Sequence, residues 1–141
     1  MAKVILHPFG DPLEKALDPA EAARNSEHMT SLTDALAAKR DEVRAGWGEA
    51  YVERVHSKGK MTTWERIHRL KDDGSEVLPV GTLVNWGRTF GGRTSPGAGV
   101  VTAFVRVAGR LTMVIANDNT VASGSWWPRT PEKIERAQEM A

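Results

Sequence analysis

Residues 99–116 read GVVTAFVRVAGRLTMVIA, and this stretch decides the fold. Its two halves, residues 99–107 and 110–116, are rich in β-branched residues, as strands are. Ala108 and Gly109 separate the halves, and glycine tolerates the positive φ that a two-residue hairpin connection needs. The stretch therefore predicts an antiparallel β-hairpin.

Both faces of the first predicted strand carry apolar side chains. Val101, Val105 and Val107 lie on one face, whereas Val100 and Phe104 lie on the other. A strand that is apolar on both faces is usually covered on both faces. The short helices predicted in this chain are too few for that, so we expect a larger partner to supply cover.

Helices are predicted on both sides of the hairpin. The Asp18-Pro19 pair starts the first one, with Asp as N-cap and Pro as the first helical residue. The Asn25-Ser26 pair is expected to end or weaken it, and Thr30 or Ser31 to cap the next. The later predicted helices are residues 32–45, residues 49–56, residues 64–70 capped by Thr62 or Thr63, and a C-terminal helix capped by Thr130.

The chain is predicted to have two parts, an N-terminal helical arm (residues 1–55) and a second part (residues 56–141). A short strand is expected at residues 3–6, within an extended N-terminal stretch. Residues 87–99 contain five glycines and are expected to be flexible.

Composition excludes several classes of protein. The 141 residues have the size of one domain, and 19 Lys and Arg against 18 Asp and Glu give a net charge of +1. This balance argues against general electrostatic binding to nucleic acid or to an anionic membrane. The absence of cysteine excludes disulfides and thiolate metal sites. The sequence has neither a bilayer-spanning apolar run nor a secretory h-region, so we expect a cytoplasmic protein.

Two other functions, metal binding and RNA binding, have little support in the sequence. The four histidines lie far apart without metal-ligand spacing, so no metal site is predicted. Residues 87–94, GRTFGGRT, are similar to Arg-Gly-rich RNA-binding segments, in which Arg88, Phe90 and Arg93 would contact bases and phosphates. The neutral overall charge favours a mobile linker between two packed layers instead.

Two loops are candidate ligand sites. Lys58 and Lys60 precede a predicted helix N-terminus, where ammonium groups and free N–H groups suit an anion such as phosphate. The alternative for these lysines is a solvated basic turn. Residues 117–128, NDNTVASGSWWP, follow a buried strand, and loops at strand ends often bind ligands. The alternative for Trp126 and Trp127 is a core role in an interface.

Several motifs occur in the order found in one enzyme family. Residues 59–67, GKMTTWERI, resemble the Gly-Lys-Leu-Thr-x-x-Glu-Arg-Ile segment of biotin-dependent acyl-CoA carboxyltransferases. Residues 70–75, LKDDGS, and residues 114–121, VIANDNTV, are similar to segments that follow in that family. Residues 126–128, WWP, resemble the aromatic-Pro loop of methylcrotonyl-CoA carboxylase β and glutaconyl-CoA decarboxylase α subunits. The resemblance covers about residues 55–141 and corresponds to the N-terminal lobe of the family.

The resemblance implies an α/β fold, namely part of a crotonase-like carboxyltransferase domain with an N-terminal helical arm, a β-hairpin and a helix. Family members move a carboxyl group between biotin and the α-carbon of an acyl-CoA. The resemblance implies no catalytic residue within these motifs, and no metal ligand. The predicted CoA-binding residues are Ala116, Asn117, Asp118, Ser123 and Gly124, with Lys58 and Lys60 as physical candidates for the CoA phosphates and Trp126 and Trp127 for the acyl pocket.

Family chains are several times longer than this one. We therefore expect a truncated product or the small subunit of a split enzyme, inactive on its own. The sequence has no Met-Lys-Met-type attachment tripeptide, so biotin is expected on another chain or domain. The expected partners are a larger crotonase-like chain, a biotin carrier protein or biotin carboxylase, and acyl-CoA, within a homo- or hetero-oligomer. A membrane partner is expected only for the decarboxylase type. The alternative functions are a non-catalytic assembly subunit and a small RNA-binding module.

Overall fold

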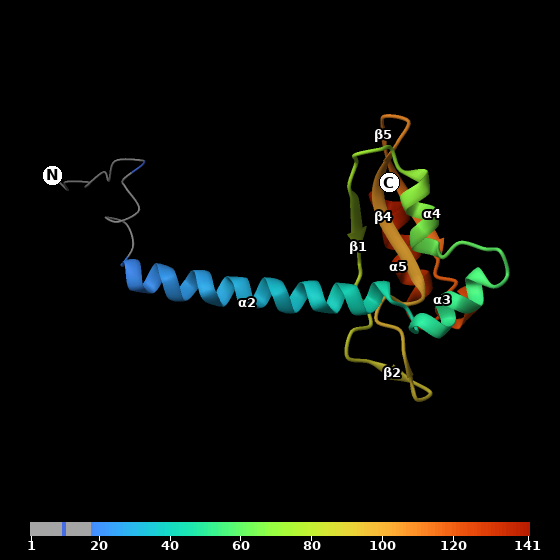
Figure 1. Cartoon of the computed structure of the whole chain (residues 1–141), viewed down its shortest axis with the longest axis horizontal. Coiled ribbons are helices and arrows are strands. Elements are labelled where there is room, and N and C mark those ends of the chain that lie inside the picture. The colour runs from blue at the N-terminus through green and yellow to red at the C-terminus, as the bar shows by residue number, and fades with distance from the viewer. Residues whose placement is uncertain (1–9, 11–17) are drawn as a thin grey trace. The chain divides into compact units, whose positions relative to one another are not determined.

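The computed structural model describes residue 10 and residues 18–141 (Figure 1). The strand expected at residues 3–6 lies outside the described residues. The chain forms two compact units, Met1–Ala37 and Ala38–Ala141. Helix α2 (Pro19–Arg44) contributes its first part to the first unit, and all the other helices and strands described below belong to the second.

Helix α2 begins as the sequence predicts. The side chain of Asp18 accepts a hydrogen bond from the backbone N–H of Ala20 at 2.8 Å, as an N-cap does. The predicted break at Asn25-Ser26 is wrong, because α2 is one continuous helix of 26 residues. Asn and Ser cost only a few tenths of a kcal/mol in a helix interior. The Thr30 hydroxyl donates to the carbonyl of Ser26 four residues earlier instead of capping a new helix.

A three-stranded antiparallel sheet forms the centre of the second unit. Its strands are β1 (Val77–Val80), β4 (Val100–Val107) and β5 (Arg110–Asn117), in the order β1-β4-β5. The predicted hairpin is confirmed, with Val107 paired to Arg110 across the turn. Ala108 and Gly109 both have positive φ, 49° and 79°, which is the geometry of a tight hairpin turn.

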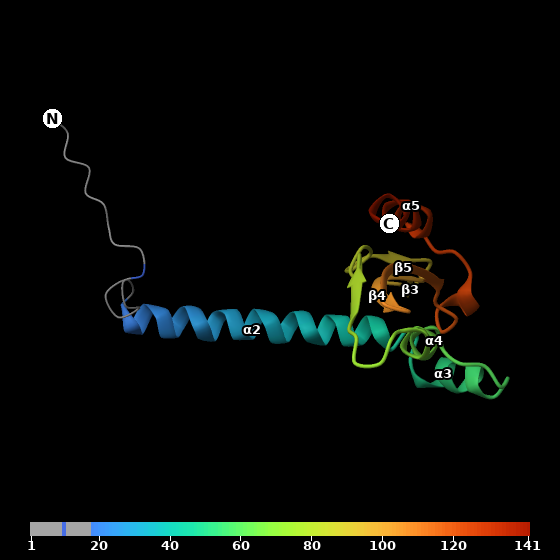
Figure 2. The same cartoon turned by 90° about the horizontal axis from the view of Figure 1, so that it is seen from above.

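Helices cover both faces of β4. On one face, Ile67 of α4 (Thr63–Leu70) forms a core with Val101 and Val105. On the other face lies α5 (Thr130–Met140), which packs against β4 and β5 and buries Ala137. Figure 2 shows these three layers, with the sheet between α5 and α4. The expectation that a larger partner must cover β4 is therefore wrong, because two short helices suffice for so narrow a sheet.

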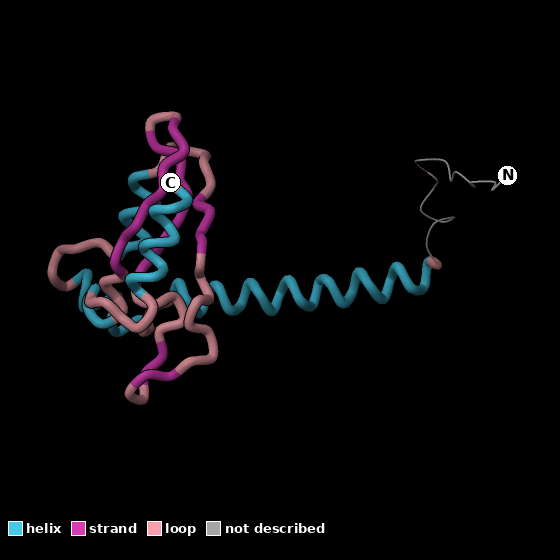
Figure 3. Tube along the Cα trace, turned by 180° about the vertical axis from the view of Figure 1, so that it is seen from behind, coloured by secondary structure: helices cyan, strands magenta, loops and turns pink. Residues whose placement is uncertain are grey.

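The glycine-rich stretch has more structure than expected. It contains the short antiparallel strands β2 (Thr89–Phe90) and β3 (Arg93–Thr94), which form a separate two-stranded sheet (Figure 3). Its last part is fixed to the core, since Ala98 is fully buried and its carbonyl accepts a hydrogen bond from the Thr130 hydroxyl at 2.6 Å. The predicted flexible linker is therefore wrong for the end of this stretch.

Two further helical segments complete the second unit. Helix α3 (Glu49–His56) has the predicted bounds and follows the Gly46-Trp47-Gly48 interruption. The 3₁₀ segment η1 (Ala122–Gly124) lies between β5 and α5. The predicted cap of α5 is wrong: Arg129 is the N-cap residue, with a φ of 73°, and Thr130 begins the helix. The Thr130 hydroxyl is used elsewhere, because it accepts from the backbone N–H of Trp127 and donates to Ala98.

Candidate functional site

A small basic hollow lies between the end of α3 and the loop that follows β5. It has a volume of about 100 Å³, and its lining includes the cationic side chains of Arg54, Lys58 and Lys60. No carboxylate side chain contributes to its lining among the described residues. The remaining lining residues are Tyr51, Val55, Asn119 and Ser123. Three predicted CoA-binding residues, Lys58, Lys60 and Ser123, are thus brought together, although Lys58 and Ser123 are 65 positions apart in the sequence.

The two lysines stand on a tight turn, as the sequence predicts. The N–H of Lys58 and that of Lys60 both donate to the carbonyl of Val55, at 3.2 and 3.3 Å. Gly59 lies between them with a φ of 66°, in the left-handed region that glycine adopts without steric cost. Because the N–H groups of both lysines bond to one carbonyl, the two exposed lysine side chains extend from the same short turn.

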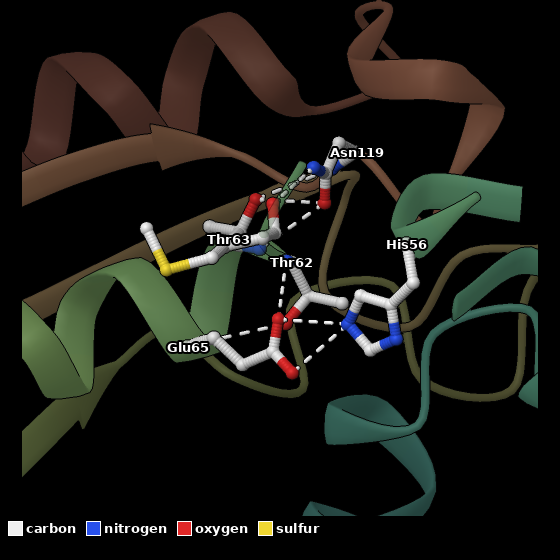
Figure 4. A network of polar contacts seen from close by, with 6 residues as sticks. His56, Thr62, Thr63, Glu65 and Asn119 are labelled. Carbon is white, nitrogen blue, oxygen red and sulfur yellow. Dashed lines mark hydrogen bonds and ion pairs between the residues drawn. The ribbon is translucent and has the colours of Figure 1, made fainter. Parts of the chain in front are cut away.

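The turn ends in a capping box (Figure 4). Thr62 is the N-cap of α4, and its side chain accepts from the N–H of Glu65 at 3.3 Å. The Glu65 carboxylate in return accepts from the Thr62 N–H at 2.6 Å. His56 Nε2 lies 3.0 Å from both oxygens of the same carboxylate. Hydrogen bonding to His56 first, and to the Thr62 backbone second, holds the pKa of Glu65 below its ordinary value.

Asn119 joins the start of α4 to the end of β5. Its side-chain oxygen accepts from the Thr63 N–H at 3.1 Å, and its amide donates to the Met61 carbonyl at 3.0 Å. The Thr63 hydroxyl also donates to the Asn117 carbonyl at 2.7 Å. Sequence reasoning did not select Asn119, Arg54 or Glu65. The Thr62-x-x-Glu65 spacing, a capping-box pattern, could have indicated Glu65.

The other predicted CoA-binding residues do not line the hollow. Asp118 is buried, and its carboxylate accepts from the N–H and hydroxyl of Thr120 at 2.9 and 2.6 Å. Ala116 is half-buried on β5. Asn117 is exposed at the end of that strand, and Gly124 lies in η1 with a φ of 86°. Their proposed contacts with CoA remain predictions.

A buried lysine of α5 bonds to the start of β4 and to the segment just before it. The Nζ of Lys133 donates to the carbonyls of Gly97 and Val100 at 2.9 and 2.7 Å. Burial lowers the pKa of Lys133 to about 8, and the Asp118 carboxylate opposes that shift. Lys133 is therefore a structural cation whose charge has a cost in the folded state.

The two tryptophans occupy different environments. Trp126 is 64% exposed. Trp127 is half-buried and packs edge-on against Trp47 and Phe90, with ring centroids 5.5 and 6.4 Å away. The Arg93 guanidinium lies 4.8 Å from the centre of the Trp47 ring. Trp127 thus belongs to an aromatic cluster outside the basic hollow, and its role in an acyl pocket remains a prediction.

Within residues 18–141, Phe90 and Arg93 have intramolecular aromatic partners, and these are two of the three residues considered for RNA binding. Across the same residues, no group of three or more His, Asp or Glu side chains could hold a metal ion. The helices of this part of the chain are all too short or too polar to cross a membrane.

The family is shown by sequence. Residues 54–141 match the family model described as carboxyl transferase domain. The chain belongs to this family. It is 38% identical over 126 residues to the biotin-dependent 3-methylcrotonyl-coenzyme A carboxylase beta1 subunit of Mycobacterium tuberculosis, covering 89% of this chain and 23% of that protein. It is 39% identical over 110 residues to the methylmalonyl-CoA decarboxylase subunit alpha of Veillonella parvula, covering 75% of this chain and 21% of that protein.

Solved structures agree with this assignment. The chain matches transcarboxylase 12S with methylmalonyl-coenzyme A and methylmalonic acid bound, with a TM-score of 0.68 and 33% identity over 77% of this chain and 21% of that one. The geranyl-CoA carboxylase beta subunit of P. aeruginosa shares the fold, with a TM-score of 0.55 and 20% identity over 99% of this chain and 24% of that one. The expected fold, part of a crotonase-like α/β carboxyltransferase domain, is confirmed. The chain spans between a fifth and a quarter of the length of these relatives.

Proposed function

We propose that this chain supplies part of the acyl-CoA-binding surface of a biotin-dependent carboxyltransferase. The observation that carries the proposal is the basic hollow, in which Arg54, Lys58 and Lys60 converge within a carboxyl transferase domain. CoA carries a diphosphate and a 3′-phosphate, and clustered cations favour such anions through charge-assisted hydrogen bonds. The small volume of about 100 Å³ suits a phosphate rather than the whole cofactor.

The reaction served by this surface would be carboxyl transfer between carboxybiotin and the α-carbon of an acyl-CoA. The residues described here would bind and orient the CoA thioester. The groups that stabilise the developing thioester enolate would come from the rest of the enzyme, so we expect no activity from the chain alone. We assign no step of biotin chemistry to this hollow. Biotin would arrive on another chain or domain.

The assembled enzyme would include a larger crotonase-like chain together with a biotin carrier protein or biotin carboxylase. We propose a cytoplasmic, oligomeric complex. A membrane partner would be added only in an enzyme of the decarboxylase type. Native mass spectrometry of the tagged chain, purified from its own host, tests these partners, because co-purification of a larger crotonase-like polypeptide is expected.

Isothermal titration of the chain with CoA tests the binding role. The double variant Lys58→Ala/Lys60→Ala should weaken CoA binding about tenfold or more, since charge-assisted hydrogen bonds contribute about 1.5–3 kcal/mol each. Arg69→Ala/Arg110→Ala is the matched control, because it removes the same charge from residues that do not line the hollow. Equal CoA affinity of the two double variants would remove the lysines from the site and overturn the proposal.

A second candidate function, assembly, is favoured by helix α2. None of its residues is buried, and Met29, Leu32 and Leu36 are exposed at the spacing of one helical face. Helices in folded proteins gain most of their stability from packing such a face against another element. Leu32→Glu/Leu36→Glu should therefore reduce the oligomeric state in sedimentation experiments while leaving CoA affinity unchanged. An unchanged oligomeric state would exclude this face from assembly.

A further inference from the structure

We propose that Glu65 is a positioning residue, which holds the turn carrying Lys58 and Lys60 in the conformation that binds phosphate. The inference rests on the proposed function of the hollow. Glu65 itself does not line the hollow. It acts through the two ends of the basic turn, defined here as residues 57–61.

The Glu65 carboxylate joins the residue before the basic turn to the residue after it. His56 is the last residue of α3, and its Nε2 contacts both Glu65 oxygens at 3.0 Å. Thr62 is the N-cap of α4, and its N–H donates to the same carboxylate at 2.6 Å. One side chain therefore fixes both ends of a five-residue connection, as Figure 4 shows for His56, Glu65 and Thr62.

Asn119 adds a second constraint on the same turn. Its amide donates to the Met61 carbonyl at 3.0 Å, and Asn119 also lines the hollow. The C-terminal end of the turn is thus tied to the opposite wall of the site. Fixing a loop before the ligand binds improves affinity, because less conformational entropy is lost on binding.

The contacts of Glu65 also keep its carboxylate from competing with phosphate for Lys58 and Lys60. A free carboxylate near the turn would compete with phosphate for the lysines. Both Glu65 oxygens are instead occupied by His56, and one of them also by the Thr62 N–H. Within residues 18–141, neither Lys58 nor Lys60 forms an ion pair. The ammonium groups therefore remain available to an anionic ligand while the carboxylate is engaged by His56.

The experiment measures CoA affinity and melting temperature for four single variants of the full chain. Glu65→Ala and His56→Ala both release the turn and should weaken CoA binding about fivefold. Glu65→Gln can still accept from the Thr62 N–H and meet His56, so it should bind CoA within about twofold of the unmodified chain.

Thr62→Ala is the matched control. It removes the side-chain cap of α4, the bond from the Glu65 N–H, but keeps the Thr62 N–H that the carboxylate binds. It should lower the melting temperature and leave CoA affinity unchanged. If Thr62→Ala weakens CoA binding as much as Glu65→Ala does, Glu65 acts through helix stability and the inference is overturned. Unchanged affinity in Glu65→Ala, or a Glu65→Gln variant as weak as Glu65→Ala, also overturns it.

The lysine variants separate this inference from the proposed function. Loss of CoA affinity in Lys58→Ala/Lys60→Ala, with none in Glu65→Ala, would leave the site in place and reject only the positioning role. No loss in the lysine double variant would reject the site itself. Should Glu65→Ala fail to fold, His56→Ala and Glu65→Gln carry the test.

Discussion

Replacing Lys133 with Met tests whether the buried lysine makes stability depend on pH. Met keeps much of the apolar volume and removes both the charge and the donors to Gly97 and Val100. The exposed fraction of Lys133 is only 7%, so its ammonium group is largely removed from water. Loss of the donors destabilises the fold, whereas loss of a buried charge relieves a desolvation cost, so the absolute change mixes two opposing effects.

The pH dependence of the free energy of unfolding separates the effect of the charge from that of the lost hydrogen bonds. The pKa of Lys133 is about 8 in the folded chain, against an ordinary value of 10.5. Between these values the unfolded state binds more protons than the folded state, so stability rises with pH across this window. The cost of the charge is fully present below pH 8 and is relieved towards pH 10.5. Linkage gives a gain of about 2 kcal/mol between about pH 7 and about pH 9.5.

Urea denaturation at several pH values measures this gain. The free energy of unfolding of the unmodified chain, minus that of Lys133→Met, should rise by about 2 kcal/mol from about pH 7 to about pH 9.5. Other titrating groups are common to both chains and cancel in the difference. A difference that stays constant over this range would show that Lys133 keeps its ordinary pKa when folded, and would refute the argument from burial.

Three further changes probe the structure around the hollow and the hairpin. Asn119→Ala removes the acceptor of the Thr63 N–H and the donor to the Met61 carbonyl, and should lower the free energy of unfolding by about 2 kcal/mol in urea titrations; a loss below about 0.5 kcal/mol would show that water replaces both bonds. Asp72→Ala removes a carboxylate that accepts from both N–H groups of the hairpin turn at 2.7 Å, and should lower the melting temperature by several degrees, whereas an unchanged value would make these bonds dispensable. The pKa of Glu65 lies below its ordinary value of 4.5, so the contribution of its carboxylate to stability is present above pH 4.5 and is lost as pH falls through the lowered pKa. In acid titrations, the difference in stability between the unmodified chain and Glu65→Gln should therefore shrink in that range. A difference that does not depend on pH would contradict this reasoning.

Local sequence determined most of the secondary structure in the second unit. The hairpin depends on two β-rich runs around Ala108 and Gly109, whose dihedral angles the residues themselves permit. The bounds of α3 follow from the glycines before it and the basic turn after it. Capping of α4 by Thr62 is likewise a local pattern. Such features need only contacts between residues a few positions apart, and the family could be recognised from motifs of the same range.

Errors arose where a local preference was weak or where packing decided. Asn25 and Ser26 only slightly disfavour a helix, so α2 continues through them. Thr is a residue type that often caps helices, but the Thr130 hydroxyl donates to the carbonyl of Ala98, 32 residues away in sequence. The glycine-rich stretch was expected to be flexible because its composition permits many conformations, and the burial of Ala98 selects one of them.

The sequence by itself thus determined the hairpin of β4 and β5, most helix ends and the family, because each depends on neighbouring residues or on motif order. Only the tertiary structure decided that α4 and α5 cover opposite faces of β4, and that Asn119 approaches the basic turn. The hollow has the same origin, since Arg54 and Lys58 reach Ser123 only after the β-hairpin has returned the chain to α3. A binding site made by distant segments depends on how the elements pack, and no local pattern specifies that packing.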